Sequence, residues 1–171
     1  MTTQDIGRLA EKYGSAVYNF CLRLTNDTYS AEELYQNTFL KAIEKASSID
    51  ENNNPKAYLC TIAVSLYKSS KRKEARRFSI APTVTLDDAS QSAGDFSDEE
   101  LLKKELFGEI KKAVFSLDEK IRIPVLLHYV SDMPLSDIAL FLKVPEGTVK
   151  SRLHTARKKI KEKLEVYKNE R

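Results

Sequence analysis

The residues with the clearest chemical potential are cations and hydrogen-bonding groups that follow the turn VPEG at positions 144–147. Apolar residues recur beside them every three or four positions, from Val149 to Tyr167, as on one face of a helix. The polar residues must then project from another face, where such groups can bind the base edges and phosphates of DNA. The exposed set predicted in this way is Lys150, Ser151, Arg152, His154, Thr155, Arg157 and Lys158.

A helix–turn–helix would position this basic face. Residues 135–161 read as a helix, a tight turn at Pro145 and a second helix, with Ile138 and Ala139 on the apolar side of the first. Ser136 is the expected N-cap of that first helix. In a helix–turn–helix the second helix lies in the major groove. The alternative is a solvated basic helix packed on a core, but the compact turn and the small Ala139 favour DNA binding.

Charge is divided along the chain into two basic segments with an acidic one between them. The net charge is only +3 over 171 residues. The first basic segment, at positions 68–77, holds six cations against Glu74 alone, and the second begins at Lys143. The acidic block between them runs from Asp87 to Glu105. Two separated basic segments predict two separate contacts with nucleic acid rather than one diffuse attraction.

Cysteine and histidine offer no site for a metal. The chain has 2 cysteines and 2 histidines without the spacing of metal ligands, so we expect no metal ion and no cofactor. Cys21 lies on the apolar stripe of the first expected helix, where a small buried hydrophobe is the simplest interpretation. Neither a signal pattern nor an apolar run of membrane-spanning length is present, so we expect a cytoplasmic protein.

Paired carboxylates do not point to an enzyme. Glu32 and Glu33 are adjacent on an expected helix, so their side chains diverge. Asp87 and Asp88 fall in the acidic segment with no histidine or cysteine nearby in the sequence. We therefore expect no catalytic residues.

Helical periodicity dominates the rest of the chain, and no segment stands out with the alternation of a strand. The expected fold is all-α, with two small helical domains joined by a flexible acidic linker. A serine followed by a glutamate three residues later predicts a capped helix start at Ser30 and again at Ser97. On the helix from Ser30 the buried stripe should include Ile43. The other helices expected before residue 135 cover 5–25, a segment that begins after Pro55, 97–115 and 117–130.

Two further surfaces carry groups suited to binding. The helix from Ser30 places Leu40 among polar residues, although a single exposed leucine needs no functional explanation. After this helix, an amide-rich loop at 47–55 leads to Tyr58 and to the first basic segment. Aromatic and cationic groups together suit unstacked, single-stranded bases. The helix–turn–helix, in contrast, suits duplex DNA.

Three strings in this sequence resemble bacterial sigma factors of the extracytoplasmic-function, or group IV, type in the sigma-70 family. They are SAEELYQNTFLKA at 30–42, PKAYLCTIAVSLYKSSKRK at 55–73 and LSDIALFLKVPEGTVKSRLHTARKKI at 135–160, in the family's order. The resemblance covers nearly the whole chain. It implies a sigma region 2-like domain at 1–78, a linker at 79–96 and a sigma region 4-like domain at 97–171. The implied function is promoter-specific initiation by core RNA polymerase, with −35 duplex recognition and −10 strand opening.

The resemblance also implies partners and site residues. The partners would be the β′ clamp helices and β flap of core RNA polymerase, promoter DNA and an anti-sigma factor, with no membrane insertion. The −35 contacts would be the seven exposed residues of the second helix of the helix–turn–helix. The polymerase contacts would be Glu32, Glu33, Gln36, Asn37 and Leu40. The −10 contacts would be Asn52, Asn53, Asn54, Tyr58, Thr61, Ser65, Lys68 and Arg72.

The chain departs from the family's pattern at several positions. Tyr58 stands where the family often has Trp, Thr61 where it has Arg, and Ser65 where it has Asn. Tyrosine can still stack on a base, but the usual arginine and asparagine contacts to the −10 element are lost. Lys143 occupies a turn position where Gly is common, at a cost of about 1 kcal/mol if that backbone is left-handed. The alternative function is a helix–turn–helix regulator that binds duplex DNA without polymerase.

Overall fold

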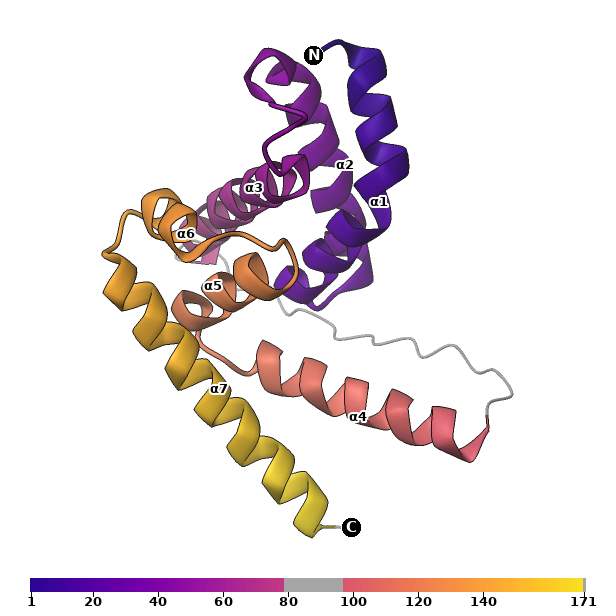
Figure 1. Cartoon of the computed structure of the whole chain (residues 1–171), viewed down its shortest axis with the longest axis vertical. Helices are drawn as coiled ribbons and strands as arrows, with labels where there is room; N and C mark the ends of the chain where they lie inside the picture. Colours follow the sequence, from indigo (N-terminus) through magenta and orange to yellow (C-terminus); the bar gives the residue numbers. More distant parts are fainter. Residues whose placement is uncertain (79–96, 171) are drawn as a thin grey trace. The chain divides into compact units, whose positions relative to one another are not determined.

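The fold is all-α, as expected, in a computed structural model that describes residues 1–78 and 97–170 (Figure 1). Within those residues there is no strand. The expected linker at 79–96 lies outside them. The helices are α1 (Thr3–Thr25), α2 (Thr28–Glu44), the 3-10 turn η1 (Ala46–Ser48), α3 (Pro55–Phe78), α4 (Asp98–Phe115), α5 (Glu119–Tyr129), α6 (Leu135–Leu142) and α7 (Glu146–Asn169).

The helices belong to two compact units. The first contains α1, α2 and α3 together with the short segment Tyr129–Met133. The second contains α4, α5 as far as His128, α6 and α7. Each unit has its own buried apolar residues, so each unit positions its own surface side chains.

The first unit is a three-helix core. Each helix buries one stripe, with Phe20, Leu24, Ala31 and Leu59 among the side chains that have no exposed surface. Asp27 is the N-cap of α2, since its carboxylate accepts a 2.8 Å hydrogen bond from the Ser30 backbone N–H. The expected cap at Ser30 is therefore wrong. Hydrogen bonds from the side chain and backbone of Ser30 lower the pKa of Asp27.

Helices α1 and α2 approach closely where Gly14 lies. A Cβ atom at this position would come within 2.9 Å of the Tyr35 hydroxyl oxygen. The Tyr35 ring makes edge-on contacts with Tyr18 and Phe39, at centroid distances of 5.9 and 5.0 Å. The missing side chain of Gly14 thus leaves room for this aromatic cluster, which fixes the orientation of α2.

Cys21 and Cys60 are both buried in the first unit as free thiols. Burial raises the pKa of Cys21 to about 12, and it also raises the pKa of Cys60. Both thiols therefore stay protonated at neutral pH and pack as small apolar groups, which confirms the interpretation of Cys21 as a buried hydrophobe.

The second unit begins with a capping box. The Ser97 hydroxyl accepts from the Glu100 backbone N–H, and the Glu100 carboxylate accepts from the Ser97 N–H, so the expected start of α4 is confirmed. The corner between α4 and α5 is held by the buried Arg122, whose guanidinium donates to the carbonyls of Phe115 and Leu117 at 3.0 and 3.3 Å. Phe115 is the last residue of α4, so its carbonyl has no partner within the helix, and Arg122 supplies one.

Helices α6 and α7 form the expected helix–turn–helix. Ile138 and Ala139 are buried on α6, and Lys143 has a left-handed backbone with φ 56°. The N-cap of α6 is Pro134 rather than Ser136, and no side chain caps the helix. Because Ser136 already lies in the first turn, its hydroxyl is not placed to accept from a later N–H group.

None of the helices within residues 1–78 and 97–170 is both long enough and apolar enough to cross a membrane.

Candidate nucleic-acid interface

Helix α7 separates an apolar seam from a polar face. Val149, Leu153 and Ala156 are buried, whereas Ser151 and His154 are exposed on the opposite side. The other exposed members of the predicted set are Lys150, Arg157 and Lys158, and the half-buried ones are Arg152 and Thr155. Packing of the seam against the rest of the second unit fixes which side chains can face a groove. The geometry thus places the predicted residues on one outward surface.

Two contacts within α7 limit what its side chains can do. The Thr155 hydroxyl donates to the Ser151 carbonyl at 3.0 Å, so its oxygen can still accept a hydrogen bond from another group. Lys150 lies 3.5 Å from the Glu146 carboxylate, one turn earlier. This exposed pair contributes little to stability, so the lysine can exchange it for a phosphate.

Helix α3 carries a second polar stripe. Tyr58, Thr61, Ser65, Lys68 and Arg72 are spaced three, four, three and four residues apart, so they share one side of the helix. Tyr58 and Thr61 are half-buried and the other three are exposed. The Thr61 hydroxyl donates to the Tyr58 carbonyl at 2.7 Å. The stripe combines an aromatic ring at one end with cations at the other, which suits an unstacked strand.

The three asparagines before α3 have different roles. Asn54 has a left-handed backbone with φ 44°, and its side-chain oxygen accepts from the Ala57 N–H at 3.1 Å. Its side chain therefore caps α3. Asn52 and Asn53 are exposed in the loop, where an Asp50 oxygen accepts from the Asn52 backbone N–H at 2.9 Å. The loop thus presents two amides outward, while Asn54 positions the helix that follows.

Helix α2 presents an exposed stripe with both apolar and polar groups. All five predicted residues are exposed: Glu32, Glu33, Gln36, Asn37 and Leu40. Leu40 is 60% exposed. A large apolar side chain with that much contact with water is a candidate for burial by a partner.

Two further residues extend the α2 stripe beyond what the sequence predicted. Tyr29 is 76% exposed, and Ile43 is 40% exposed, so the expectation that Ile43 is buried is wrong. Ala42 takes the inward position instead, and Ile43 lies three residues after Leu40 and seven after Gln36. The spacing of Ile43 from Leu40 and Gln36 was the sequence signal that could have placed Ile43 on the exposed stripe. The stripe thus has an apolar residue near each end.

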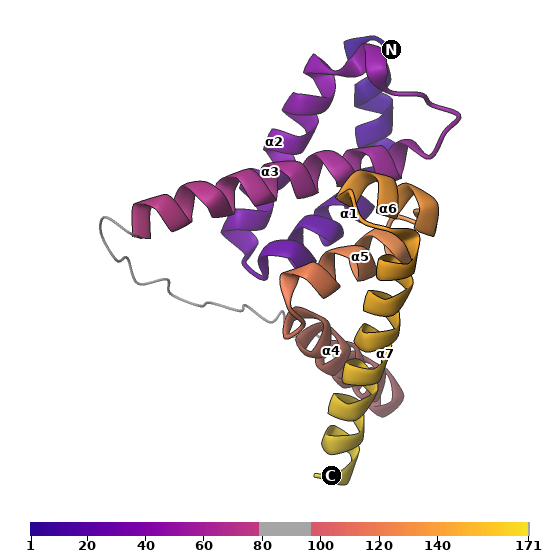
Figure 2. The same cartoon turned by 90° about the vertical axis from the view of Figure 1, so that its left-hand side faces the viewer.

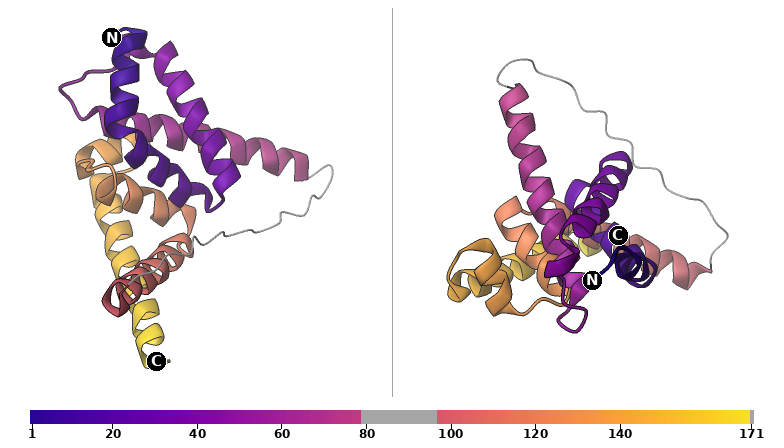
Figure 3. Two further views of the ribbon diagram at one scale, coloured as in Figure 1. Left: turned by 90° about the vertical axis from the view of Figure 1, so that its right-hand side faces the viewer. Right: turned by 90° about the horizontal axis from the view of Figure 1, so that it is seen from above.

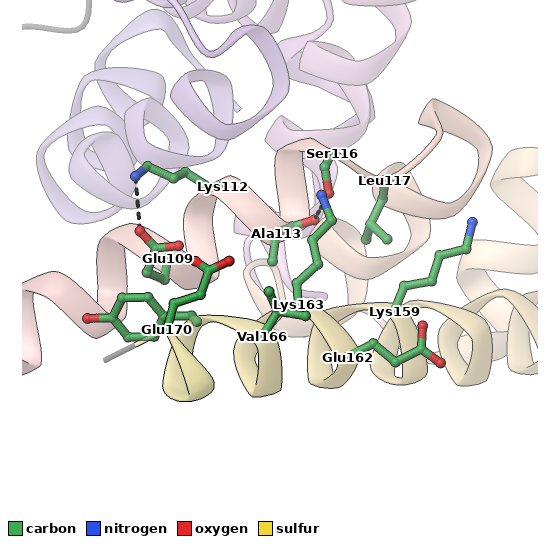
Figure 4. A pocket seen from close by; sticks show the side chains of 11 residues that line it. Glu109, Lys112, Ala113, Ser116, Leu117, Lys159, Glu162, Lys163, Val166 and Glu170 are labelled. Carbon is green, nitrogen blue, oxygen red and sulfur yellow. Dashed lines mark hydrogen bonds and ion pairs between the residues drawn. The ribbon is translucent and has the colours of Figure 1, made fainter.

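The second unit also contains a groove of about 740 Å³ between α4 and α7 (Figure 4). Ala113, Leu117 and Val166 contribute apolar surface, and Val166 is 56% exposed. Charged side chains such as Glu109 and Lys112 line its edge, and this pair lies 3.0 Å apart. An apolar interior with a charged edge is typical of a surface that binds a protein segment.

Comparison with protein families assigns both units. Residues 9–77 match the model for sigma-70 region 2, and residues 107–160 match the model for sigma-70 region 4. The first match falls on α1 to α3, and the second falls on α4 to α7. The two matches occur in the order that the sequence strings predicted, and together they cover most of the chain.

Individual relatives agree with the family models. The chain is 27% identical to the ECF RNA polymerase sigma factor SigW of Bacillus subtilis over 162 residues, which are 91% of this chain and 87% of SigW. It is 29% identical to the ECF RNA polymerase sigma factor SigL of Mycobacterium tuberculosis over 149 residues, 86% of this chain and 82% of SigL.

Solved structures show the same fold. The sigma factor RpoE from Bartonella quintana, in complex with the anti-sigma factor NepR, matches with a TM-score of 0.78 and 27% identity over 95% of this chain and 98% of that one. CnrH, in complex with the cytosolic domain of CnrY, matches with a TM-score of 0.64 and 17% identity over 95% and 89%. The second likeness concerns the fold alone.

Proposed function

This chain belongs to the extracytoplasmic-function sigma factors of the sigma-70 family, and from that premise we propose how its two units share promoter recognition. It directs core RNA polymerase to promoters and initiates promoter-specific transcription. One observation supports separate roles for the two units in promoter recognition. Regions 2 and 4 fall on separate compact units, and each unit has its own exposed polar surface. The proposed role is non-catalytic, and it is exerted in the cytoplasm, where polymerase and promoter meet.

Polymerase docking is assigned to the exposed stripe of α2. Gln36 and Leu40 form its centre, with Glu32, Glu33 and Asn37 beside them. Tyr29 and Ile43 extend the same stripe, so we add them to the proposed contact with the β′ clamp helices. Burial of exposed apolar groups such as Leu40 drives the association. The carboxylates and amides determine how α2 aligns with the clamp helices.

Opening and capture of the −10 element are assigned to the first unit. Asn52 and Asn53 can bind an extruded base, because amides match the hydrogen-bonding edges of bases. Tyr58 can stack on a neighbouring base, and Lys68 and Arg72 can bind the backbone phosphates beyond it. Asn54 supports this site by capping α3 rather than by touching DNA. Captured bases exchange stacking in the duplex for contacts with protein, so opening requires no separate energy source.

Recognition of the −35 element is assigned to α7. Ser151 and His154 point away from the buried seam and face base edges in the major groove. Lys150 and Arg157 lie toward the flanks of this face, where phosphates would be. Arg152, Thr155 and Lys158 complete the proposed contact surface. The half-buried position of Arg152 and Thr155 places them at the edges of the surface.

Two protein partners remain to be placed. The groove between α4 and α7 is the proposed binding site for the β flap, because its apolar interior can accept a helix from a partner. An anti-sigma factor is the second proposed partner. The matching sigma factor RpoE is in complex with the anti-sigma factor NepR, and this chain has the same fold.

The docking assignment is tested with a charge-introducing variant and a matched control. Gln36→Glu with Leu40→Glu should weaken binding to core polymerase by about 2 kcal/mol or more, because the contact would bury an unpaired charge. The control is Ser15→Glu with Asn19→Glu, which adds the same charges at the same spacing on exposed positions of α1. Fluorescence titration with core polymerase measures both. Equal affinity for the two variants would refute the assignment.

The function itself is tested by run-off transcription. Core polymerase with this chain should transcribe a subset of a promoter library that core polymerase alone does not transcribe. Tight duplex binding by the free chain, together with no promoter-dependent transcript, would instead support a regulator that acts without polymerase.

A further inference from the structure

Helix α7 begins with a carboxylate that the proposed −35 surface does not include. Glu146 is the first residue of the helix, its side chain is exposed, and its carboxylate lies 3.5 Å from the Lys150 ammonium group. Figures 2 and 3 show the turn from α6 at this end of α7, with the rest of the helix leading away from α6. Glu146 therefore lies at the end of the helix whose residues contact base edges in a helix–turn–helix complex.

This carboxylate stands alone in a basic segment. Glu146 is the only acidic residue between positions 138 and 161, and the same segment holds seven lysines and arginines. In a complex with DNA, the phosphates on both sides of the groove repel a carboxylate at this position. Glu146 therefore weakens promoter binding unless it accepts a hydrogen bond from a base.

Helix stability is the simplest alternative explanation, since an acidic side chain in the first turn favours a helix. The next residue, however, is Gly147, which lowers helix stability relative to alanine. A Cβ atom at Gly147 would meet nothing within 4 Å and its φ is not positive, so neither packing nor backbone requires a glycine there. No side chain caps α7 either. The start of α7 is thus not optimised for helix stability, and the missing side chain leaves room for DNA beside Glu146.

The four bases differ in what they offer a carboxylate. A carboxylate oxygen accepts hydrogen bonds and donates none. In the major groove only the amino groups of cytosine and adenine donate, and adenine places its N7 acceptor beside that donor. Guanine and thymine present acceptors, which a carboxylate repels. Cytosine is therefore the base that suits Glu146 best.

We propose that Glu146 determines part of the −35 specificity by accepting a hydrogen bond from the amino group of a cytosine in the major groove. This inference rests on the proposed function, because it adds a base contact to the surface already assigned to α7. The exposed ion pair with Lys150 contributes little to stability, so exchange of that pair for a phosphate frees the carboxylate for the base. The same carboxylate discriminates against guanine and thymine, whose acceptors would face it.

The test replaces the carboxylate with an amide of the same shape. Glu146→Gln keeps the length of the side chain, but an amide pairs best with adenine, whose donor and acceptor match its own. Glu165→Gln is the control, because it removes the same charge from an exposed position of α7 about 28 Å further along the helix. Holoenzyme made with each protein is used to select from a duplex library in which every −35 position is randomised.

The expected result is a change of preferred base at one position. Wild-type holoenzyme should prefer cytosine there by about tenfold over the other bases. Glu146→Gln should change that preference from cytosine to adenine, whereas Glu165→Gln should retain the wild-type preference at every position.

A second measurement removes the amino group from the DNA instead. A cytosine analogue that lacks this group should lower the affinity of wild-type holoenzyme about tenfold more than that of holoenzyme with Glu146→Ala, which has no carboxylate to lose the bond. Because the analogue weakens base pairing equally in both titrations, the difference isolates the contact with Glu146.

Three results would overturn the inference. An unchanged preference at every −35 position in Glu146→Gln would leave the carboxylate with a role in helix stability alone. An equal change on all −35 sequences would show that it acts on phosphates rather than on a base. An equal effect of the analogue on wild type and Glu146→Ala would exclude the bond to the amino group. Failure of the proposed function is distinguishable, because wild-type holoenzyme would then give no promoter-dependent transcript at all.

Discussion

Helices α3 and α7 are both 24 residues long and both basic, yet they separate apolar from charged residues in different directions. In α3 the separation runs along the axis, with the core at the start and an exposed basic end at residues 70–77, where cations cover about two thirds of the circumference. In the first half of α7 it runs around the circumference, with a buried seam that includes Leu153 and a polar face that includes His154. The two helices therefore offer DNA different kinds of surface.

This difference relates packing to the kind of DNA readout. Base reading needs side chains held at fixed angles, because donors and acceptors in the major groove have defined positions. The seam of α7 supplies that constraint. Phosphate binding depends on the placement of charge more than on the orientation of side chains, and the cations at the end of α3 are spread over several sides of the helix. A helix can thus be positively charged for either purpose, and the position of its apolar residues distinguishes the two.

The largest expected effect tests the axial division of α3. Leu59→Ala, in the buried first half, should lower the free energy of unfolding by about 3 kcal/mol, because it leaves a cavity in the core. Lys73→Ala, in the exposed end of α3 at residues 70–77, should change it by less than about 0.5 kcal/mol. Urea denaturation followed by circular dichroism measures both. A similar loss for both variants would mean that the end of α3 is packed, and the axial division would be wrong.

The next effect tests the circumferential division of α7. His154→Ala should change −35 base preference by about 1–3 kcal/mol at one or two base pairs. Arg157→Ala should weaken all promoters to a similar degree and reduce the salt dependence of binding, as expected for a phosphate contact. Holoenzyme selection from a randomised −35 library separates the two outcomes. If His154→Ala lowered output equally on every −35 sequence, this histidine would not read bases.

A smaller effect concerns the turn between α6 and α7, which orients α7. Lys143→Gly should raise the free energy of unfolding of the second unit by about 1 kcal/mol, because glycine adopts the left-handed backbone with φ 56° without the strain of a Cβ. The seam and the polar face should remain unchanged. Thermal unfolding and −35 preference are the measurements. A stabilised variant with altered base preference would show that the turn, as well as the seam, sets the orientation of α7.

The smallest effect compares a threonine on each helix. The hydroxyls of Thr61 and Thr155 each donate to a carbonyl of their own helix, at 2.7 and 3.0 Å. Thr61→Val and Thr155→Val should therefore alter DNA preference by less than about 0.5 kcal/mol, because neither hydroxyl proton is directed toward a base. Binding of the matching −10 and −35 probes by holoenzyme provides the measurement. A larger change would show that the hydroxyl oxygen accepts a bond from a base.

The order and type of the helices could be predicted from the sequence because the apolar periodicity is strong. The start of α4 at Ser97 was predictable for a local reason, since its capping box involves only residues three apart. The starts at Ser30 and Ser136 were wrong because capping depends on the backbone of the residues before the helix. Asp27 and Pro134 occupy the cap positions, and both have extended backbone there.

The exposed surfaces were only partly predictable. The buried and exposed sides of α7 followed from its long seam, which leaves little freedom in orientation. Helix α2 was harder to orient, because Ala42 and Ile43 are both apolar and only packing decides which one faces inward. The capping role of Asn54 depends on its left-handed backbone, which three consecutive asparagines do not reveal in sequence. The base-contact assignments remain predictions.

The two buried cysteines allow the opening rate of the first unit to be measured. Cys21 and Cys60 are the only cysteines in the chain, and both lie within the core formed by α1, α2 and α3. A thiol-modifying reagent can react with them only when that core opens, so the labelling rate measures the frequency of opening of this unit alone. Labelling in the presence of core polymerase, of promoter DNA or of an anti-sigma factor would rank these partners by how firmly each holds the strand-opening unit closed.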